Sequence, residues 1–236
     1  MVNEAQKLLE SNFALYSDML DCIERREAEI IFADSEVVLL LHVRSDIYML
    51  APFARVGLLR AVEYLGNVEK RTVVLHGEEY FAEYKALVGA VHDVPCYQAT
   101  FPVRQGTEGL REDVVIRPLG TEWTDFVTKH YSRSGGRSEY CYDRLKSGAM
   151  FGAFIDGEIV GFIGQHDENS IGLLEVLPAF SGKGVGKKLE AFMINRILDE
   201  GHTPYCHVIV GEEKAYNFHM KKEGVIMSTD KLTWTF

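Results

Sequence analysis

Apolar residues change their spacing several times along the chain, and each change predicts a new element. In the first 29 residues they recur every three or four positions, as on one face of a helix: Leu8, Leu9, Phe13, Leu15, Met19, Leu20 and Ile23. Short apolar runs bounded by turn residues then predict strands. We expect strands over residues 29–33, 37–43, 46–53, 71–75 and 95–101, and helices over 54–65 and 78–88.

The remainder of the chain alternates in the same way. Two apolar runs flank Asp156-Gly157, a dipeptide typical of two-residue hairpin turns. Strands are expected over residues 113–118, 150–155, 159–166, 170–177, 204–210 and 225–236, and helices over 121–130, 139–146, 185–200 and 212–223. The pattern therefore predicts a mixed α/β protein of the α+β class.

A polar segment with two glycines, residues 103–112, interrupts the periodic pattern near the middle of the chain. Such a composition is typical of linkers between domains. The length of 236 residues allows one large domain or two modest ones. We predict an N-terminal α/β domain over residues 1–108 and a second domain over 109–236. The alternative is a long loop inside one domain.

Composition excludes several classes of protein. With 47% hydrophobic residues the chain is not expected to be disordered, and no apolar run approaches the about 18 residues of a membrane span. A net charge of −10 disfavours nucleic acid as a partner. The four cysteines form no C-x-x-C pair, no secretory signal is present and the histidines show no metal-binding spacing. We therefore expect a cytoplasmic protein with free thiols and no metal.

One segment combines glycines and lysines in a way that suits an anion. Gly182, Gly184 and Gly186 alternate just before and at the start of the helix expected from residue 185, with lysines at 183, 187 and 188. Glycines allow a ligand to approach the backbone, and the first N–H groups of a helix attract negative charge. The spacing fits neither the P-loop nor the dinucleotide fingerprint. We predict a phosphate or pyrophosphate site, with a flexible strand-to-helix turn as the alternative.

The same segment resembles the acyl-CoA-binding segment of the GNAT superfamily of N-acetyltransferases, whose signature is Q/R-x-x-G-x-G/A between a strand and a helix. Residues 181–186, Ser-Gly-Lys-Gly-Val-Gly, match it except at Ser181, and the element order of residues 113–236 is similar to the GNAT fold. The resemblance implies that acetyl-CoA is the co-substrate. It also implies these binding residues: Val176 and Leu177 for the pantetheine arm, and Ser181, Gly182, Lys183, Gly184, Val185, Gly186 and Lys187 for the pyrophosphate.

The resemblance further implies direct transfer of the acyl group to an amine. Glu175, on the strand beside the expected thioester, is the candidate general base, and its alternative is a solvent-facing carboxylate. Asp167, Glu168 or solvent could take that part instead. A backbone N–H at a strand bulge near Val176 would stabilise the oxyanion. The strand from Cys206 would diverge from the strand ending at Leu177.

The general acid is less clearly marked. The family often places a tyrosine four residues before a glycine near the end of the last helix, and here that position holds Met220, which cannot donate a proton. Tyr216 and His219 are the nearby candidates, with packing or a cofactor contact as the alternative. Glu212 and Glu213 stand where the family often has an asparagine.

The N-terminal half shows a similar element order without a glycine-lysine segment. Residues 50–57 occupy the corresponding place, and Pro52 there lacks a backbone donor. The chain looks like glycine N-acyltransferase-like members of the family, and we expect a degenerate GNAT-like domain that helps to form the acceptor site. The alternative is an unrelated α+β domain.

These observations predict an acetyl-CoA-dependent N-acyltransferase acting on a small-molecule amine or amino acid, as a monomer or homodimer. Two alternatives stay open. One is a non-catalytic acyl-CoA-binding sensor, favoured by the missing side chains at Ser181 and Met220. The other is a protein N-terminal or lysine acetyltransferase.

Overall fold

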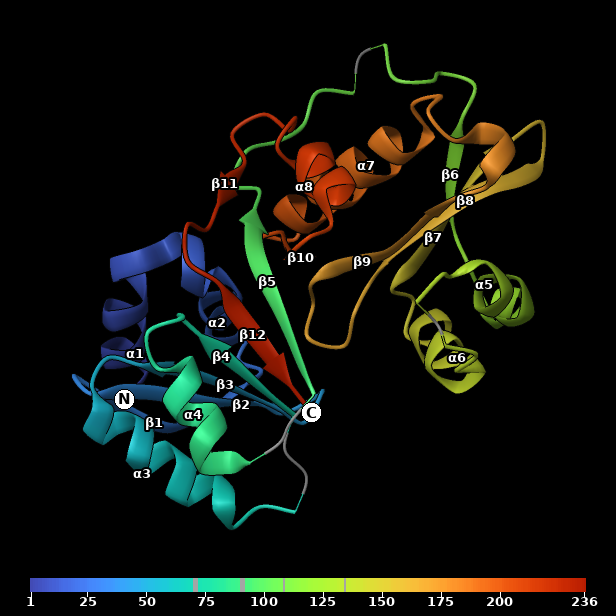
Figure 1. Ribbon diagram of the computed structural model, residues 1–236. Coiled ribbons are helices and arrows are strands. Elements are labelled where there is room, and N and C mark those ends of the chain that lie inside the picture. The colour runs from blue at the N-terminus through green and yellow to red at the C-terminus, as the bar shows by residue number, and fades with distance from the viewer. Residues whose placement is uncertain (70–71, 90–91, 108, 134) are drawn as a thin grey trace. The chain divides into compact units, whose positions relative to one another are not determined.

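The computed structural model describes residues 1–69, 72–89, 92–107, 109–133 and 135–236 (Figure 1). Contacts divide the chain into two compact units. Unit 1 comprises Met1–Pro102 with Tyr205–Phe236, and unit 2 comprises Val103–Pro204. This division differs from the predicted domains 1–108 and 109–236, because the C-terminal strands pair with strands of the N-terminal segment.

Unit 1 contains one mixed sheet in the order β1-β2-β3-β4-β12-β5-β10, with β11 also paired to β5. Only the β3–β4 pair is parallel among the pairings that the structure describes. The strands are β1 (Ala28–Asp34), β2 (Val37–His42), β3 (Ile47–Pro52), β4 (Thr72–His76), β5 (Asp93–Thr100), β10 (Tyr205–Ile209), β11 (Ile226–Met227) and β12 (Leu232–Thr235). The helices are α1 (Val2–Leu9), α2 (Phe13–Glu24), α3 (Arg55–Gly66), α4 (Phe81–Val88) and α8 (Glu213–His219).

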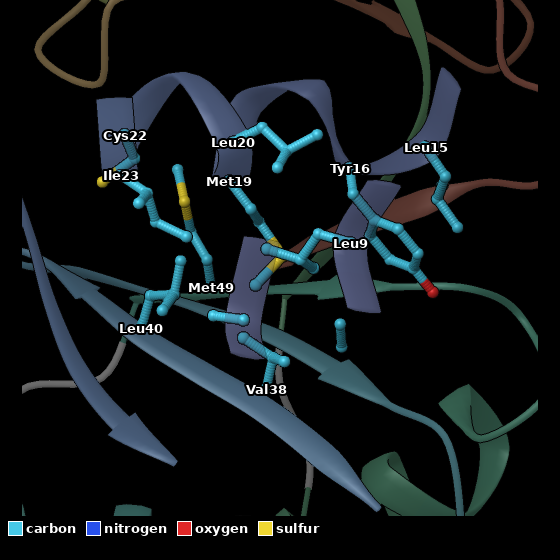
Figure 2. Packing of buried hydrophobic residues seen from close by; sticks show 12 residues of the cluster. Leu9, Leu15, Tyr16, Met19, Leu20, Cys22, Ile23, Val38, Leu40 and Met49 are labelled. Carbon is cyan, nitrogen blue, oxygen red and sulfur yellow. The ribbon is translucent and has the colours of Figure 1, made fainter. Parts of the chain in front are cut away.

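Helices cover both faces of this sheet, which explains the uninterrupted apolar run of β2. Val38 and Leu40 pack against α1 and α2, as Figure 2 shows. Val37 and Leu39 pack on the opposite face against Leu58 and other residues of α3. A strand buried on both faces needs no polar alternation, and all four of these side chains are fully buried.

Two C-terminal strands complete the sheet. β12 lies between β4 and β5, with Trp234 opposite Val74 on one side and Val94 on the other. β10 pairs with β5 at the edge, with His207 opposite Gln98. The sheet of unit 1 therefore depends on both ends of the sequence.

A buried polar network also joins the two segments of unit 1. The Asp18 carboxylate bonds to Nε2 of His76 at 2.8 Å, and Gln98 Oε1 lies 3.0 Å from Nε2 of His207. The indole of Trp234 donates to Nδ1 of His207 at 3.1 Å. Burial opposes ionisation of Asp18, but the attraction of His76 and hydrogen bonds from His207 and His76 outweigh it and lower the pKa of Asp18 well below its usual range.

Unit 2 contains an antiparallel sheet in the order β6-β7-β8-β9. Its strands are β6 (Val115–Pro118), β7 (Met150–Ile155), β8 (Glu158–Gln165) and β9 (Ile171–Val176), and its α-helices are α5 (Thr124–His130), α6 (Ser138–Lys146) and α7 (Val185–Asp199). Phe154 and Phe162 belong to a core with α5 and α6, whereas Phe151 packs against Phe192 of α7. Figure 1 shows α7 and the α5–α6 pair on opposite faces of this sheet.

Candidate functional site

The glycine-lysine segment connects β9 to α7, as the sequence predicts. Val176 ends β9 opposite Gly161, and the N–H of Leu177 still bonds to the carbonyl of Val160 at 2.9 Å. A 3₁₀ turn over Pro178–Phe180 follows, and α7 begins at Val185. The segment is thus fixed to the sheet at one end and to a 15-residue helix at the other.

Two glycines give this connection its shape. Gly182 and Gly184 have φ angles of +74° and +87°, and Gly184 is the N-cap of α7. A Cβ added to Gly182 would meet nothing within 4 Å, so the backbone there is open to a ligand. The φ of Gly184 is one that L side chains rarely adopt. The conformation therefore depends on glycine, and the open face suits a group that binds the backbone itself.

Positive charge and backbone donors lie together at this end of α7. The first N–H groups of a helix, here those of Val185, Gly186 and Lys187, have no carbonyl partner within the helix, and the helix dipole adds positive potential. The side chains of Lys183 and Lys187 are exposed. The arrangement fits the pyrophosphate of a coenzyme A thioester, which needs several donors at one point.

Lys188 serves the structure instead. Its Nζ donates to the carbonyl of Arg111 at 2.6 Å. The guanidinium of Arg111 donates to the carbonyl of Lys183 at 3.1 Å and to both carboxylate oxygens of Asp113. No sequence motif marks Arg111, which precedes Lys183 by 72 positions.

Glu175 has partners that sequence reasoning did not reveal. Its Oε1 accepts hydrogen bonds from the backbone N–H of Ser132 at 2.9 Å and from the hydroxyl of Ser132 at 2.5 Å. The carboxylate is half-buried and holds the segment that follows α5. Its geometry supports a positioning role, and its role as general base stays a prediction.

The two alternative carboxylates lie at the other end of β9. Asp167 forms an ion pair with the buried Arg144, and buried Glu168 accepts a hydrogen bond from Ser170 at 2.5 Å. Burial, followed by the charges of Glu168 and Asp167, raises the pKa of Tyr140, whose hydroxyl bonds to His166. The six residues of β9, at about 3.3 Å each, separate these groups from the glycine-lysine segment.

A bulge interrupts β9 near its middle. Gly172 lies opposite Gly164 and Glu175 opposite Phe162, so β9 holds one extra residue between these pairs. Leu173 there has a φ of +48°. Such a bulge leaves a residue out of the ladder. The structure thus contains a strand bulge as expected, at Leu173 and Leu174 rather than at Val176.

Tyr216 and His219 belong to α8 of unit 1. Tyr216 packs edge-on against Tyr97 with ring centroids 5.7 Å apart, and both line a pocket of about 770 Å³. His219 Nε2 lies 3.7 Å from the sulfur of Cys206, and its ring packs near Phe101. The glycine-lysine segment belongs to unit 2, so a proton-donor role for either residue stays a prediction. The same holds for the expected divergence of the strands at Leu177 and Cys206.

The corresponding junction of unit 1 joins β3 to α3. The backbone N–H groups of Phe53 and Ala54 both donate to the carbonyl of Glu36, at 2.8 and 3.1 Å. A Cβ added to Gly57 would lie 2.1 Å from that same oxygen, so α3 packs tightly against the β1–β2 turn. Two donors of this junction are therefore engaged, and its backbone at Gly57 lies against Glu36.

Other features add little to the site. All four cysteines are buried free thiols. Within the described ranges, no group of three or more His, Cys, Asp or Glu side chains is placed to hold a metal ion. No described helix has the length and apolar character needed to cross a membrane.

Part of the chain matches a known protein family. Residues 117–224 match the model of the acetyltransferase (GNAT) family, a range that includes β9, the glycine-lysine segment and α7. No curated protein matches the sequence.

Solved structures share the fold at low identity. A GCN5-related N-acetyltransferase-like protein from Streptococcus suis is 14% identical with a TM-score of 0.58, covering 100% of both chains. A GCN5-related N-acetyltransferase from Kribbella flavida is 11% identical with a TM-score of 0.56, covering 98% of this chain and 94% of its own. A Drosophila protein is 18% identical with a TM-score of 0.62, covering 85% of this chain and 74% of its own. These likenesses concern the fold alone, and they span more of the chain than the matched segment.

Proposed function

We propose that this chain, whose residues 117–224 match the GNAT acetyltransferase family model, transfers an acetyl group from acetyl-CoA to the amine of a small molecule or amino acid. The family implies acyl transfer from an acyl-CoA. The observation that carries the proposal is the connection into α7, where Gly182 and Gly184 have positive φ angles and the backbone at Gly182 is open.

The binding roles follow from this geometry. The N–H groups of Gly182 and of residues 184–187 would hold the pyrophosphate, with the ammonium groups of Lys183 and Lys187 nearby. The N–H of Lys183 donates to the carbonyl of Phe180 at 3.3 Å. Backbone groups of Val176 would hold the pantetheine arm along the end of β9. The predicted part of Leu177 would be limited to packing, because its N–H bonds to the carbonyl of Val160 and its carbonyl accepts from the N–H of Phe180. Ser181 offers only a hydroxyl where the family signature has Gln or Arg. We therefore expect weaker binding than a complete signature gives.

The chemistry requires a neutral amine whose nitrogen attacks the thioester carbonyl. The carbon–nitrogen bond forms, the carbon–sulfur bond breaks, the amine loses a proton and the thiol of CoA gains one. A backbone N–H at the Leu173–Leu174 bulge is suited to stabilise the oxyanion. Glu175 is the candidate that receives the amine proton, directly or through water. Tyr216 and His219 are the candidates that return a proton to the thiolate.

We further propose that unit 1 holds no CoA at its own strand-to-helix junction, since Glu36 already engages the N–H groups of Phe53 and Ala54. This agrees with a degenerate GNAT-like origin, and its part in acceptor selection is a hypothesis. We also propose that the protein is cytoplasmic and acts as a monomer or homodimer. Its activity would involve no nucleic acid, membrane or metal.

Two measurements test the function. Calorimetric titration with acetyl-CoA measures binding, and release of the CoA thiol measures transfer to a panel of amino acids, polyamines and peptides with a free N-terminus or lysine. We expect turnover with small amines. Turnover confined to peptides would favour the protein acetyltransferase. Binding without turnover would favour the non-catalytic sensor. Two observations also favour it: the Glu175 carboxylate already accepts hydrogen bonds from Ser132, and position 220 holds a methionine. Absence of binding would overturn the proposal.

A further inference from the structure

We infer that Arg111 is a positioning residue for the glycine-lysine segment (residues 181–188) and directs the backbone N–H of Gly184 toward the cofactor. This inference rests on the proposed function and names a residue outside the family signature. Arg111 lies in the linker before β6, and its side chain would support the binding of acetyl-CoA.

Arg111 contacts the segment at two points. Its Nη1 donates to the carbonyl of Lys183 at 3.1 Å, just before α7, and its own carbonyl accepts from Nζ of Lys188 at 2.6 Å, in the first turns of α7. A Cβ added to Gly184 would lie 3.4 Å from Cγ of Arg111, so the arginine stem passes beside that glycine. One linker residue thus spans the connection from Lys183 to Lys188.

The contact with Lys183 has a directional consequence. A trans peptide is planar, and its C=O and N–H point in opposite directions. The carbonyl of Lys183 and the N–H of Gly184 share one peptide plane. A donor that holds this carbonyl on the Arg111 side therefore turns the N–H of Gly184 to the other side. It also keeps a carbonyl oxygen, which would repel a phosphate, away from the ligand.

Asp113 keeps Arg111 in this position. The guanidinium donates from Nε to Oδ1 at 2.7 Å and from Nη2 to Oδ2 at 2.5 Å. A bidentate pair fixes the plane of the guanidinium and directs the remaining nitrogen, Nη1, at Lys183. The charge of Arg111 is balanced by Asp113, so its contribution is orientation of the backbone rather than a direct phosphate contact.

Arg111 itself has a φ of 30°, a value that non-glycine residues rarely adopt. Such a conformation persists only where surrounding contacts hold it. Its carbonyl accepts from Lys188 and from the N–H of Val114, and its side chain donates to Lys183 and Asp113, so contacts on both sides hold this conformation.

The test compares Arg111→Ala and Arg111→Lys with Arg104→Ala. Arg104 is the matched control, because it is also an arginine of the linker. It pairs with the exposed Asp199 at the end of α7, away from the glycine-lysine segment. We expect Arg111→Ala to raise the Kd and KM for acetyl-CoA about tenfold while kcat changes less than twofold. Arg111→Lys should recover part of this affinity, since an ammonium can still donate to the carbonyl. Arg104→Ala should match the wild type.

A truncated substrate separates orientation from general damage to the fold. S-acetyl-pantetheine lacks the pyrophosphate, so Arg111→Ala should leave its KM unchanged. The amide resonance of Gly184 in the free protein should shift in Arg111→Ala and not in Arg104→Ala. Wild-type acetyl-CoA affinity in Arg111→Ala, or an equal loss with S-acetyl-pantetheine, would overturn the inference while the proposed function stands. A wild-type protein that does not bind acetyl-CoA would overturn both.

Discussion

The two strand-to-helix junctions, β9–α7 in unit 2 and β3–α3 in unit 1, show how similar local order can produce different chemistry. In the first, Gly182 and Gly184 adopt positive φ angles, and the space beside Gly182 is open. In the second, Phe53 and Ala54 donate their N–H groups to Glu36. An anion site requires donors that the fold leaves available, and a strand followed by a helix does not ensure this.

The two junctions also differ in the charged side chains near the start of each helix. Lys183 and Lys187 are exposed near the start of α7. At the start of α3, Arg55 forms an ion pair with Glu83 at 2.7 Å. The first junction therefore presents two lysines to solvent, whereas the arginine of the second junction is paired with an acidic side chain.

The strongest way to break this comparison is Gly184→Val. A β-branched residue at a φ of +87° forces the connection to rearrange. We expect acetyl-CoA affinity to fall at least about 100-fold, or about 2.7 kcal/mol, in calorimetric titration. Gly157→Val is the matched control, because Gly157 has the same φ of +87° in the β7–β8 hairpin and nothing within 4 Å of an added Cβ. Equal losses of affinity in both variants would argue against a binding site for the pyrophosphate at Gly184.

The next prediction concerns the unit that holds the closed junction. Replacing Asp18 by Asn breaks a buried charged network, which costs about 3–5 kcal/mol in free energy of unfolding. The pKa of Asp18 is lowered in the folded state, so its stabilisation is present above its unfolded pKa of about 3.9 and lost as the pH falls toward the folded pKa.

Urea unfolding between pH 7 and pH 2 checks this, and the acid-dependent loss should be smaller in Asp18→Asn. Glu78→Gln removes an exposed pair with Lys231 in the same unit and should cost less than about 1 kcal/mol. An Asp18→Asn protein as stable as the wild type would contradict the account of the network.

Glu175→Gln sharpens the comparison at the reacting end of β9. If the carboxylate is the general base, kcat should fall about 100-fold with little change in acetyl-CoA affinity. Ser132→Ala removes the hydroxyl that bonds to Glu175 and retains the backbone N–H, so it serves as the control for positioning. Equal losses of kcat in both variants would assign Glu175 to positioning, and full activity of Glu175→Gln would exclude it as base.

The smallest expected effect tests the charge difference between the junctions. Lys187→Ala should weaken acetyl-CoA binding roughly fivefold, because an exposed charge at a helix N-terminus contributes about 1 kcal/mol at most. The loss should shrink as salt is added. Arg55→Ala, at the start of α3, should leave affinity unchanged at every salt concentration. A fivefold loss in Arg55→Ala would show that the second junction also attracts the ligand.

Local patterns in the sequence predicted much of the fold. The apolar spacing located most helices and strands within a few residues of their observed ends. The Asp156-Gly157 turn is confirmed, since Ile155 pairs with Glu158 and both turn residues have positive φ. The glycine-lysine segment lies between β9 and α7 as expected. These features depend on neighbouring residues, whose conformational preferences the sequence states directly.

Contacts between distant residues required the tertiary structure. β12 lies in the sheet between β4 and β5, and nothing in its own short sequence identifies these partners. Arg111 reaches Lys183 across 72 positions, and Ser132 reaches Glu175 across 43. Sequence alone determined most of the elements, the place of the glycine-lysine segment and the likeness to the GNAT family. Folding decided which strands share a sheet, which donors remain available and which side chains hold the segment, because those depend on pairings that local preference does not encode.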